Sequence, residues 1–210
     1  MTATFHSNID LAALILAGGQ SSRMGEDKAL ISYNGVPILQ RVYQVATACT
    51  ENIYVLSPWN ERYQQILSPE CKYLIESQPG RGPLFGFAEG LSQIPNDWIL
   101  LLACDLPLLK VEVLQGWIER LPQLPSSISA LAPQRSEIWE PMCAFYRREV
   151  LAELQGFLQT GGRSFQKWFS HICVEALHVD SEINLMLYNC NTPLDLEEIV
   201  NKHRPNPPKP

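Results

Sequence analysis

The chain has 210 residues, of which 46% are hydrophobic and 18% are charged, and its formal net charge is −6. This length suits one domain with a full hydrophobic core, and the composition is that of a globular rather than a disordered protein. The negative charge argues against broad electrostatic binding of nucleic acid. An acidic chain that binds polyphosphates must gather its cations locally or recruit a metal ion.

No apolar run approaches the roughly 18 residues that cross a bilayer, so we expect no membrane partner. Residues 1–10 lack the basic and apolar regions of a secretory signal and are expected to be a flexible lead-in. The six cysteines are scattered and form no Cys-x-x-Cys pair, which favours reduced thiols over disulfides or a zinc site. We therefore expect a cytoplasmic protein.

The first informative stretch is an apolar run over residues 11–17, which predicts a strand buried on both faces. It leads into the string LAGGQSSRMGEDK at residues 16–28. Glycines after a buried strand let the backbone approach a bulky anion, and unpaired N–H groups there form a concave anion site. Arg23 and Lys28 add two cations that offset part of a triphosphate's charge. The string matches neither the Walker A nor the dinucleotide pattern, and its plainest alternative is a glycine-rich turn with solvated basic residues.

The next segments alternate between helix and strand signals. Helical spacing begins at Pro37, residues 52–57 predict a strand, residues 60–67 a polar helix and residues 72–76 a third strand. This alternation predicts an α/β fold with three layers, in which a mostly parallel sheet carries helices on both faces.

A second glycine- and proline-rich loop, QPGRGPLFG, covers residues 78–86. It is either a rigid loop that opens a helix over residues 84–94 or a wall of a nucleotide pocket. Ligands of open α/β sheets bind beyond the carboxyl ends of strands, and this loop follows the third strand.

Residues 98–103 form the most hydrophobic strand candidate, and Cys104-Asp105-Leu106-Pro107 follows it directly. A single carboxylate at the end of a buried strand suits Mg²⁺, which takes its other ligands from water and substrate phosphates. The alternative is that Asp105 caps a helix running to about residue 121.

The second half predicts strands at residues 128–132 and 142–146, a helix to residue 158, and an edge strand at residues 174–179. Glu140, in the loop between the first two strands, either faces a substrate or is solvated. Arg163 is either a surface residue or a phosphate contact.

In the string YNCNTP at residues 188–193, Asn189 and Asn191 point the same way if the segment is extended. We expect a single domain over residues 11–203 and a flexible proline-rich tail over residues 204–210.

Three strings, LAGGxSxRMGxDK, Cys-Asp-x-Pro and Asn-x-Asn-Thr-Pro, occur in the order found in nucleotidyltransferases, and the chain most closely resembles the molybdenum cofactor guanylyltransferases. The resemblance implies a Rossmann-like nucleotidyltransferase fold and a transferase that moves GMP from GTP to the terminal phosphate of molybdopterin, releasing pyrophosphate. It implies GTP and molybdopterin as small-molecule substrates and Mg²⁺ as cofactor. We expect a monomer that contacts other molybdenum-cofactor proteins transiently.

The resemblance also implies roles for individual residues. Arg23, Lys28 and Asp105 would be catalytic, with Asp105 as the metal ligand. Ser57 and Ser77 stand where the family often has an asparagine and an aspartate near the nucleoside, so those two contacts are uncertain. The expected substrate-binding residues are Leu16, Ala17, Gly18, Gly19, Lys28, Ser57, Ser77, Gly82, Pro83, Leu84, Asp105, Asn189 and Asn191.

Three other functions remain open from the sequence. A cytidylyltransferase acting on the same acceptor is the nearest, although such enzymes tend to have Ala-Ala-Gly in the first loop and to lack Gly-Pro-Leu in the second. A sugar-phosphate nucleotidyltransferase is disfavoured because the chain has no sugar-lid extension. A non-catalytic carrier of the pterin cofactor is disfavoured by the presence of Arg23, Lys28 and Asp105.

Overall fold

The computed structural model describes residues 9–18, 27–190 and 195. In this part of the chain, no helix combines the length and the apolar character that spanning a membrane requires. The main sheet consists of β1 (Leu11–Leu16), β4 (Asn52–Ser57), β5 (Lys72–Ile75), β6 (Trp98–Ala103), β7 (Ala130–Arg135), β8 (Ile138–Trp139), β9 (Cys143–Arg147) and β10 (Val174–His178), and a separate hairpin consists of β2 (Ser32–Tyr33) and β3 (Val36–Pro37).

Six α-helices and several short 3₁₀ turns complete the described part of the chain. The helices are α1 (Ile38–Thr47), α2 (Pro83–Gln93), α3 (Val111–Ile118), α4 (Leu151–Gln159), α5 (Phe165–Trp168) and α6 (Ser181–Met186). The 3₁₀ turns are η1 (Lys28–Leu30), η2 (Asn60–Arg62), η3 (Leu121–Gln123), η4 (Arg148–Val150) and η5 (Phe169–His171).

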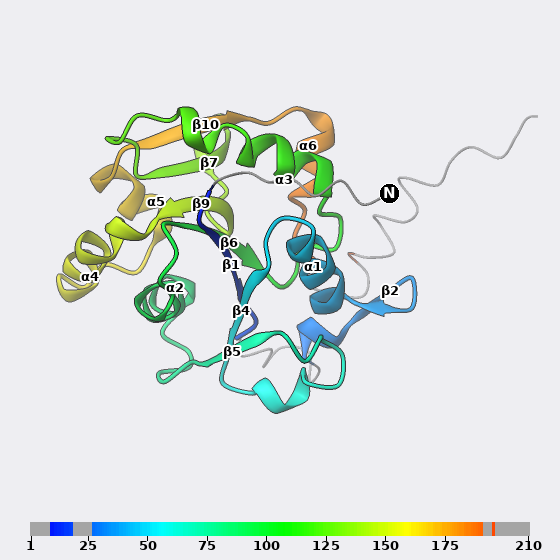
Figure 1. Cartoon of the computed structure of the whole chain (residues 1–210). Coiled ribbons are helices and arrows are strands. Elements are labelled where there is room, and N and C mark those ends of the chain that lie inside the picture. Colours follow the sequence, from blue (N-terminus) through cyan, green and yellow to red (C-terminus); the bar gives the residue numbers. More distant parts are fainter. Residues whose placement is uncertain (1–8, 19–26, 191–194, 196–210) are drawn as a thin grey trace, which may run out of the picture.

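The main sheet has the strand order β10-β7-β9-β6-β1-β4-β5, with β8 paired to β7 (Figure 1). Strands β5, β4, β1 and β6 are parallel, whereas β9 runs antiparallel to both β6 and β7. The carboxyl ends of the parallel strands therefore meet at one edge, where ligands of open α/β sheets bind.

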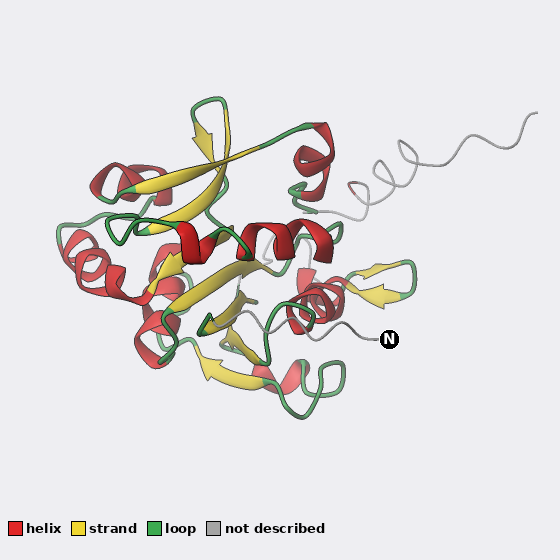
Figure 2. Cartoon of the chain, turned by 45° about the horizontal axis from the view of Figure 1, so that its top comes forward, coloured by secondary structure: helices red, strands yellow, loops and turns green. Residues whose placement is uncertain are grey.

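Strand β1 is central and fully buried, and its side chains alternate between two hydrophobic cores. Ala13 and Ile15 pack with α1, α3 and α6, whereas Leu14 packs with α2, α4 and α5 on the opposite face. The strands are thus enclosed between two groups of helices, as Figures 1 and 2 show. The predicted three-layer α/β fold with a mostly parallel sheet is confirmed.

The strands predicted at residues 52–57 and 98–103 have the predicted bounds, and β10 lies at a sheet edge as expected. The polar helix predicted at residues 60–67 was wrong, since only the 3₁₀ turn η2 forms there. Trp59 precedes that turn without a capping side-chain bond, and the Asn60 amide instead donates to the Leu74 carbonyl at 2.8 Å. Strand β8, helix α6 and the β2–β3 hairpin were not predicted.

Candidate active site

A cleft of about 510 Å³ opens at the carboxyl ends of β1 and β6. One side is formed by the end of β1, the turn η1 and the segment after β6, and the other by the β7–β8 hairpin and the residues that follow it. The lining residues are Leu16, Ala17, Gly18, Asp27, Lys28, Ala29, Pro83, Ala103, Cys104, Asp105, Ile138, Trp139, Glu140, Pro141, Met142, Gln166 and Asn189.

Asp105 enters the cleft directly after β6, the most hydrophobic strand. Its Oδ1 atom is buried and has no hydrogen-bond partner among the described residues. Burial raises the pKa of the carboxyl, and the nearby Lys28 ammonium opposes this rise. The alternative that Asp105 caps a helix was wrong, because α3 begins at Val111 with Lys110 in the capping position. A buried oxygen without a partner in an open cleft is the donor that a cation or a ligand hydrogen would satisfy.

Lys28 is positioned by the turn that it begins. Asp27 precedes η1 and caps it, because its Oδ1 atom accepts a hydrogen bond from the Ala29 N–H at 3.1 Å. The structure thus brings Lys28 and Asp105 into one cleft, as the sequence predicted. Gly19, Arg23 and Asn191, which were predicted to act with them, lie outside the described residues.

Tyr63 joins the two ends of the first glycine-rich loop. Its side chain is fully buried, and its hydroxyl lies 3.1 Å from the Ala17 carbonyl oxygen and 2.9 Å from Asp27 Oδ2. Arg62 adds an ion pair to the same Asp27 oxygen at 3.6 Å. The two acceptors share the single hydroxyl hydrogen, which holds the strand end close to the residue before Lys28, so Tyr63 helps to position the two ends of the loop. The sequence offered no signal for this role.

The backbone of residues 16–18 is held tightly at the floor of the cleft. The Leu16 carbonyl accepts from Cys104 N at 3.3 Å, and Ala17 N donates to the Leu56 carbonyl at 2.9 Å. At Gly18 an added Cβ would overlap Glu76 Oε2 and lie 3.2 Å from Pro58 Cδ. A side chain at position 18 would therefore displace the Glu76 carboxylate, which packs directly against the Gly18 backbone.

Glu76, which the sequence analysis did not select, follows β5 and is half-buried. Burial raises its pKa, and the negative charge of Glu89 raises it further. The neighbouring Ser77, which was selected, does not line the cleft, and its N–H donates to both oxygens of Glu89 at 2.9 and 3.1 Å. Both Glu76 and Ser77 line an adjoining hollow of about 240 Å³.

Several other predicted contacts have different positions from those expected. Ser57 is fully buried and its Oγ accepts from Trp59 N at 3.0 Å, so its hydroxyl has a structural partner and no access to the cleft. Leu84 is also fully buried, because this face of α2 packs on the sheet. Gly82 precedes α2 with φ at +94°, a conformation that favours glycine, and Pro83 alone of this group lines the cleft.

The opposite wall is formed by the β7–β8 hairpin, with Ile138 63% exposed at its end. Gln166 on α5 holds this wall, because its amide accepts from Trp139 N at 3.1 Å and donates to the Trp139 carbonyl at 2.7 Å. Glu140 lines the cleft and pairs with Arg135 at 2.6 Å, so it is not a solvated loop residue, and its contact with substrate stays a prediction. Asn189 lines the cleft as well.

Arg163, which was considered as a phosphate contact, does not line this cleft, and neither does Arg81 in the second glycine-rich loop. Both guanidinium groups lie against the Phe85 ring, that of Arg81 at 3.6 Å and that of Arg163 at 4.6 Å from its centroid. Such cation–π contacts account for their positions without a ligand.

Comparisons with known proteins agree with this geometry. Residues 13–175 match the family described as the MobA-like NTP transferase domain. The chain is 48% identical to the probable molybdenum cofactor guanylyltransferase of Nostoc sp. over 94% of this chain and 96% of that one, and 31% identical to the molybdenum cofactor guanylyltransferase of Vibrio cholerae over 92% and 93%. The structure of molybdopterin-guanine dinucleotide biosynthesis protein A from Archaeoglobus fulgidus superposes with a TM-score of 0.73 at 21% identity, covering 91% of this chain and 97% of that chain.

Proposed function

Since this chain belongs to the molybdenum cofactor guanylyltransferase family of MobA-like NTP transferases, we propose that it transfers GMP from GTP to the terminal phosphate of molybdopterin and releases pyrophosphate. The observation that supports this assignment most directly is that Lys28 and Asp105 line the same cleft, beside the end of β1.

Asp105 fits a divalent cation, because its buried Oδ1 atom has no hydrogen-bond partner within the part of the chain that the structure describes. No cluster of three or more potential metal ligands occurs within the described residues, so the remaining ligands would be phosphate oxygens and water, as is usual for Mg²⁺. When bound, Mg²⁺ would neutralise charge on the phosphate oxygens.

The chain's own residues position the triphosphate. The backbone of residues 16–18 contacts the nucleotide at the end of β1, and Lys28, with Arg23, neutralises the triphosphate and the departing pyrophosphate. An oxygen of the acceptor phosphate bonds to the α-phosphorus while the bond to the β-phosphate oxygen breaks. The attacking phosphate is largely ionised at neutral pH, so positioning and charge neutralisation suffice and no strong general base is needed.

Glu76 is suited to reading the guanine base, because its carboxylate lies against Gly18 at the nucleotide end of the site. Guanine presents two neighbouring donors, N1–H and the 2-amino group, which match the two oxygens of a carboxylate. Cytosine presents one amino donor beside an acceptor nitrogen, which a carboxylate repels. The Glu76 carboxylate therefore favours GTP over CTP. We propose that Glu76, rather than Ser57 or Ser77, selects the base.

The acceptor side is the wall formed by the β7–β8 hairpin. Ile138, Trp139 and Met142 offer apolar surface to a pterin ring system, while Glu140 and Asn189 offer polar groups. Asn191 is proposed to face the acceptor phosphate together with Asn189.

The assignment is tested by incubating the protein with Mg²⁺, molybdopterin and each of the four nucleoside triphosphates in turn. We expect pyrophosphate release and a guanine dinucleotide product, identified by mass spectrometry, with GTP alone. Turnover with CTP alone would instead identify a cytidylyltransferase, and binding of molybdopterin without turnover would identify a carrier.

A further inference from the structure

The cleft wall formed by the β7–β8 hairpin and the segment after it carries one carboxylate. This wall contributes residues 138–142 to the cleft, and Glu140 is the only one of them with a charged side chain. Glu140 follows β8 directly, on the side of the cleft opposite Lys28 and Asp105. Other residues serve the nucleotide, the metal ion and the acceptor phosphate, which leaves the Glu140 carboxylate for another part of the acceptor.

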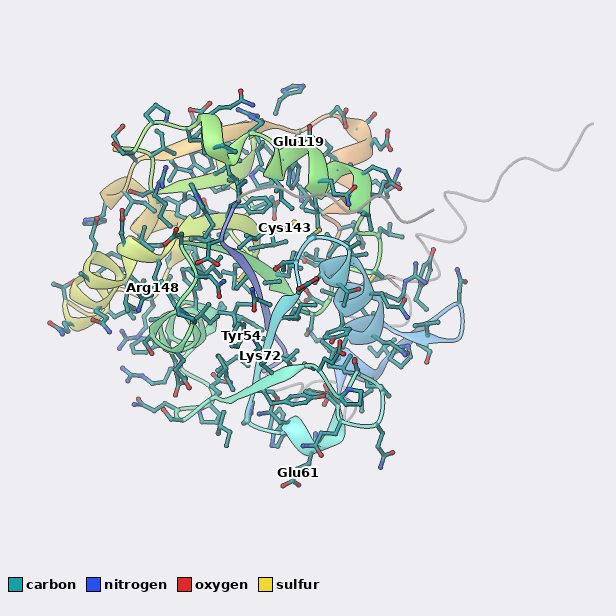
Figure 3. The ribbon with its side chains drawn as sticks, in the orientation of Figure 1. Tyr54, Glu61, Lys72, Glu119, Cys143 and Arg148 are labelled. Carbon is teal, nitrogen blue, oxygen red and sulfur yellow. The ribbon has the colours of Figure 1, made fainter. Side chains whose placement is uncertain are left out.

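The backbone around Glu140 is held at three points. The Glu140 N–H donates to the Pro133 carbonyl at 2.9 Å, and the Glu140 carbonyl accepts from the Cys143 N–H at 3.3 Å. The Tyr146 hydroxyl donates to the carbonyl of the next residue, Pro141, at 2.8 Å. Cys143 and Tyr146 are buried in β9, and Figure 3 shows Cys143 in the interior of the molecule. The Glu140 side chain therefore starts from a fixed position.

Arg135 on β7 holds the carboxylate itself. Its Nη2 atom lies 2.6 Å from Glu140 Oε1 and donates to the Leu187 carbonyl at 3.3 Å, two residues before Asn189 of the cleft. Arg135 does not line the cleft, and within the described residues no other group donates to this carboxylate. A carboxylate offers about four lone-pair positions, so both Glu140 oxygens can still accept hydrogen bonds from a ligand.

The ligand that fits such a carboxylate has two neighbouring donors. The pyrimidinone ring of a pterin presents N3–H beside its 2-amino group, the same pair that guanine presents at N1–H and its 2-amino group. We propose that Glu140 is a specificity-determining residue for the acceptor, whose N3–H and 2-amino group donate to its carboxylate while Arg135 keeps this carboxylate in position. This inference rests on the proposed function, because it takes a pterin as the acceptor.

The surroundings of Glu140 suit a flat ring system and set its direction. Ile138, Trp139 and Met142 line the same wall and offer apolar surface to the ring faces, while the Glu140 side chain is only 22% exposed. Ligand sites of this kind combine apolar walls with a few polar groups that fix orientation. The carboxylate repels the acceptor phosphate but attracts the neutral donor edge, so the pterin edge lies at Glu140 and the phosphate points toward Lys28.

Two pteridines that differ in this edge provide the first test. The compound 6-hydroxymethylpterin has the 2-amino group, whereas 6-hydroxymethyllumazine has a carbonyl oxygen in its place. Pteridine fluorescence, titrated with the protein in the absence of GTP, measures their binding. We expect the wild type to bind the pterin about tenfold more tightly, because the carbonyl oxygen of the lumazine would face a carboxylate. Equal binding of the two compounds, or binding of neither, would overturn the proposal.

Glu140→Gln should remove or reverse this preference. An amide offers one donor and one acceptor, which fit the carbonyl oxygen and the N3–H of the lumazine. The ratio of the two dissociation constants does not depend on the folded fraction, so it separates recognition from lost stability. Glu175→Gln is the matched control, because Glu175 is also paired with an arginine but lies on β10, outside the cleft, and it should keep the wild-type preference.

The transfer reaction provides a second readout for Glu140→Gln. We expect KM for molybdopterin to rise about tenfold, with KM for GTP unchanged. A rise in KM for GTP alone would show that Glu140 contacts the nucleotide, which would overturn the inference. Failure of the proposed function would give a different result, namely a wild type that prefers the pterin in the binding assay but releases no pyrophosphate with any nucleoside triphosphate.

The positioning role of Arg135 is tested by the same pair of pteridines. Arg135→Gln should reduce the preference for the pterin, because the Glu140 carboxylate then loses the group that orients it. Arg135→Lys keeps a cation beside Glu140 and should restore part of the preference. If Arg135 only supports the fold, Arg135→Gln will weaken binding of both compounds equally and leave their ratio unchanged.

Discussion

The Tyr63 hydroxyl lies 2.9 Å from Asp27 Oδ2 and 3.1 Å from the Ala17 carbonyl, so one buried group ties together the two ends of the glycine-rich loop. The hydroxyl has one hydrogen, which these two acceptors share, and Tyr63→Phe removes it without changing the packing of the ring. Since such a hydrogen bond is worth about 1 kcal/mol, we expect KM for GTP to rise about fivefold, with a smaller change in kcat.

Steady-state kinetics on Tyr63→Phe would test this positioning role. Tyr43→Phe is the matched control, because Tyr43 is also a buried tyrosine but lies on α1, outside the cleft. If both variants lose activity only in proportion to lost stability, Tyr63 has no separate role in nucleotide binding.

Glu76→Gln should impair the recognition of guanine. An amide offers one acceptor and one donor in place of two acceptors, so it opposes one of the two guanine donors. We expect kcat/KM for GTP to fall about tenfold to a hundredfold, and that for ITP, which lacks the 2-amino group, to fall less. Equal losses with GTP and ITP would show that Glu76 does not contact the 2-amino group.

The pH dependence of GTP binding provides a second test of Glu76. Burial and Glu89 raise the pKa of Glu76, so its carboxylate gains a proton at a higher pH than an exposed glutamate does. Only the ionised form accepts hydrogens from both guanine donors, so GTP affinity should fall as the pH is lowered through the raised pKa. Calorimetric titrations with GTP at several pH values should show this fall in affinity for the wild type but not for Glu76→Gln.

The sequence predicted the parts of the site that follow long apolar runs. Lys28 and Asp105 follow such strands, and the carboxyl ends of parallel strands meet in space whatever their distance along the chain. The side chains of Ser57 and Leu84 are buried and do not line the cleft, because the sequence shows which segment reaches the site but not which way each side chain turns. Tyr63 was missed because its partners Ala17 and Asp27 are distant in sequence.

Asp105→Asn should separate activity from stability. Asp105 Oδ1 is buried and has no hydrogen-bond partner among residues 9–18, 27–190 and 195, so replacing the charged carboxylate by a neutral amide should stabilise the metal-free protein by about 1 kcal/mol. Turnover should fall at least about a hundredfold because the proposed metal loses its protein ligand, while metal-free GTP binding should persist. Thermal unfolding, calorimetry without metal and pyrophosphate release would measure these three effects.

Glu140→Gln is a matched control for Asp105→Asn. Burial also raises the pKa of Glu140, but this carboxylate is paired with Arg135 at 2.6 Å. Removing one member of a partly buried ion pair leaves the other without its counter-charge, so Glu140→Gln should lower the melting temperature. A destabilised Asp105→Asn would show that the Asp105 carboxylate supports the fold rather than a ligand.

Gly90→Ala should destabilise the protein although it lies within helix α2. A Cβ at this position would lie 2.5 Å from Leu14 Cδ2 and 3.0 Å from Leu14 Cδ1, and Leu14 is fully buried in β1. Overpacking of this kind costs about 1–3 kcal/mol, which outweighs the gain in helix propensity of about 1 kcal/mol. Gly116→Ala on α3 meets nothing within 4 Å and should stabilise, and urea unfolding of both variants would compare them.

Gln166→Leu should weaken binding of the acceptor but not of GTP. The Gln166 amide makes two hydrogen bonds to the backbone of Trp139, at 3.1 and 2.7 Å, and thereby fixes the cleft wall opposite Lys28 and Asp105. Losing two exposed bonds is worth about 1 kcal/mol, so we expect KM for molybdopterin to rise about fivefold with KM for GTP unchanged. Gln93→Leu, which removes an exposed glutamine bond on α2 outside the cleft, should change neither constant. A matching rise in KM for GTP would show that the hairpin wall serves the nucleotide rather than the acceptor.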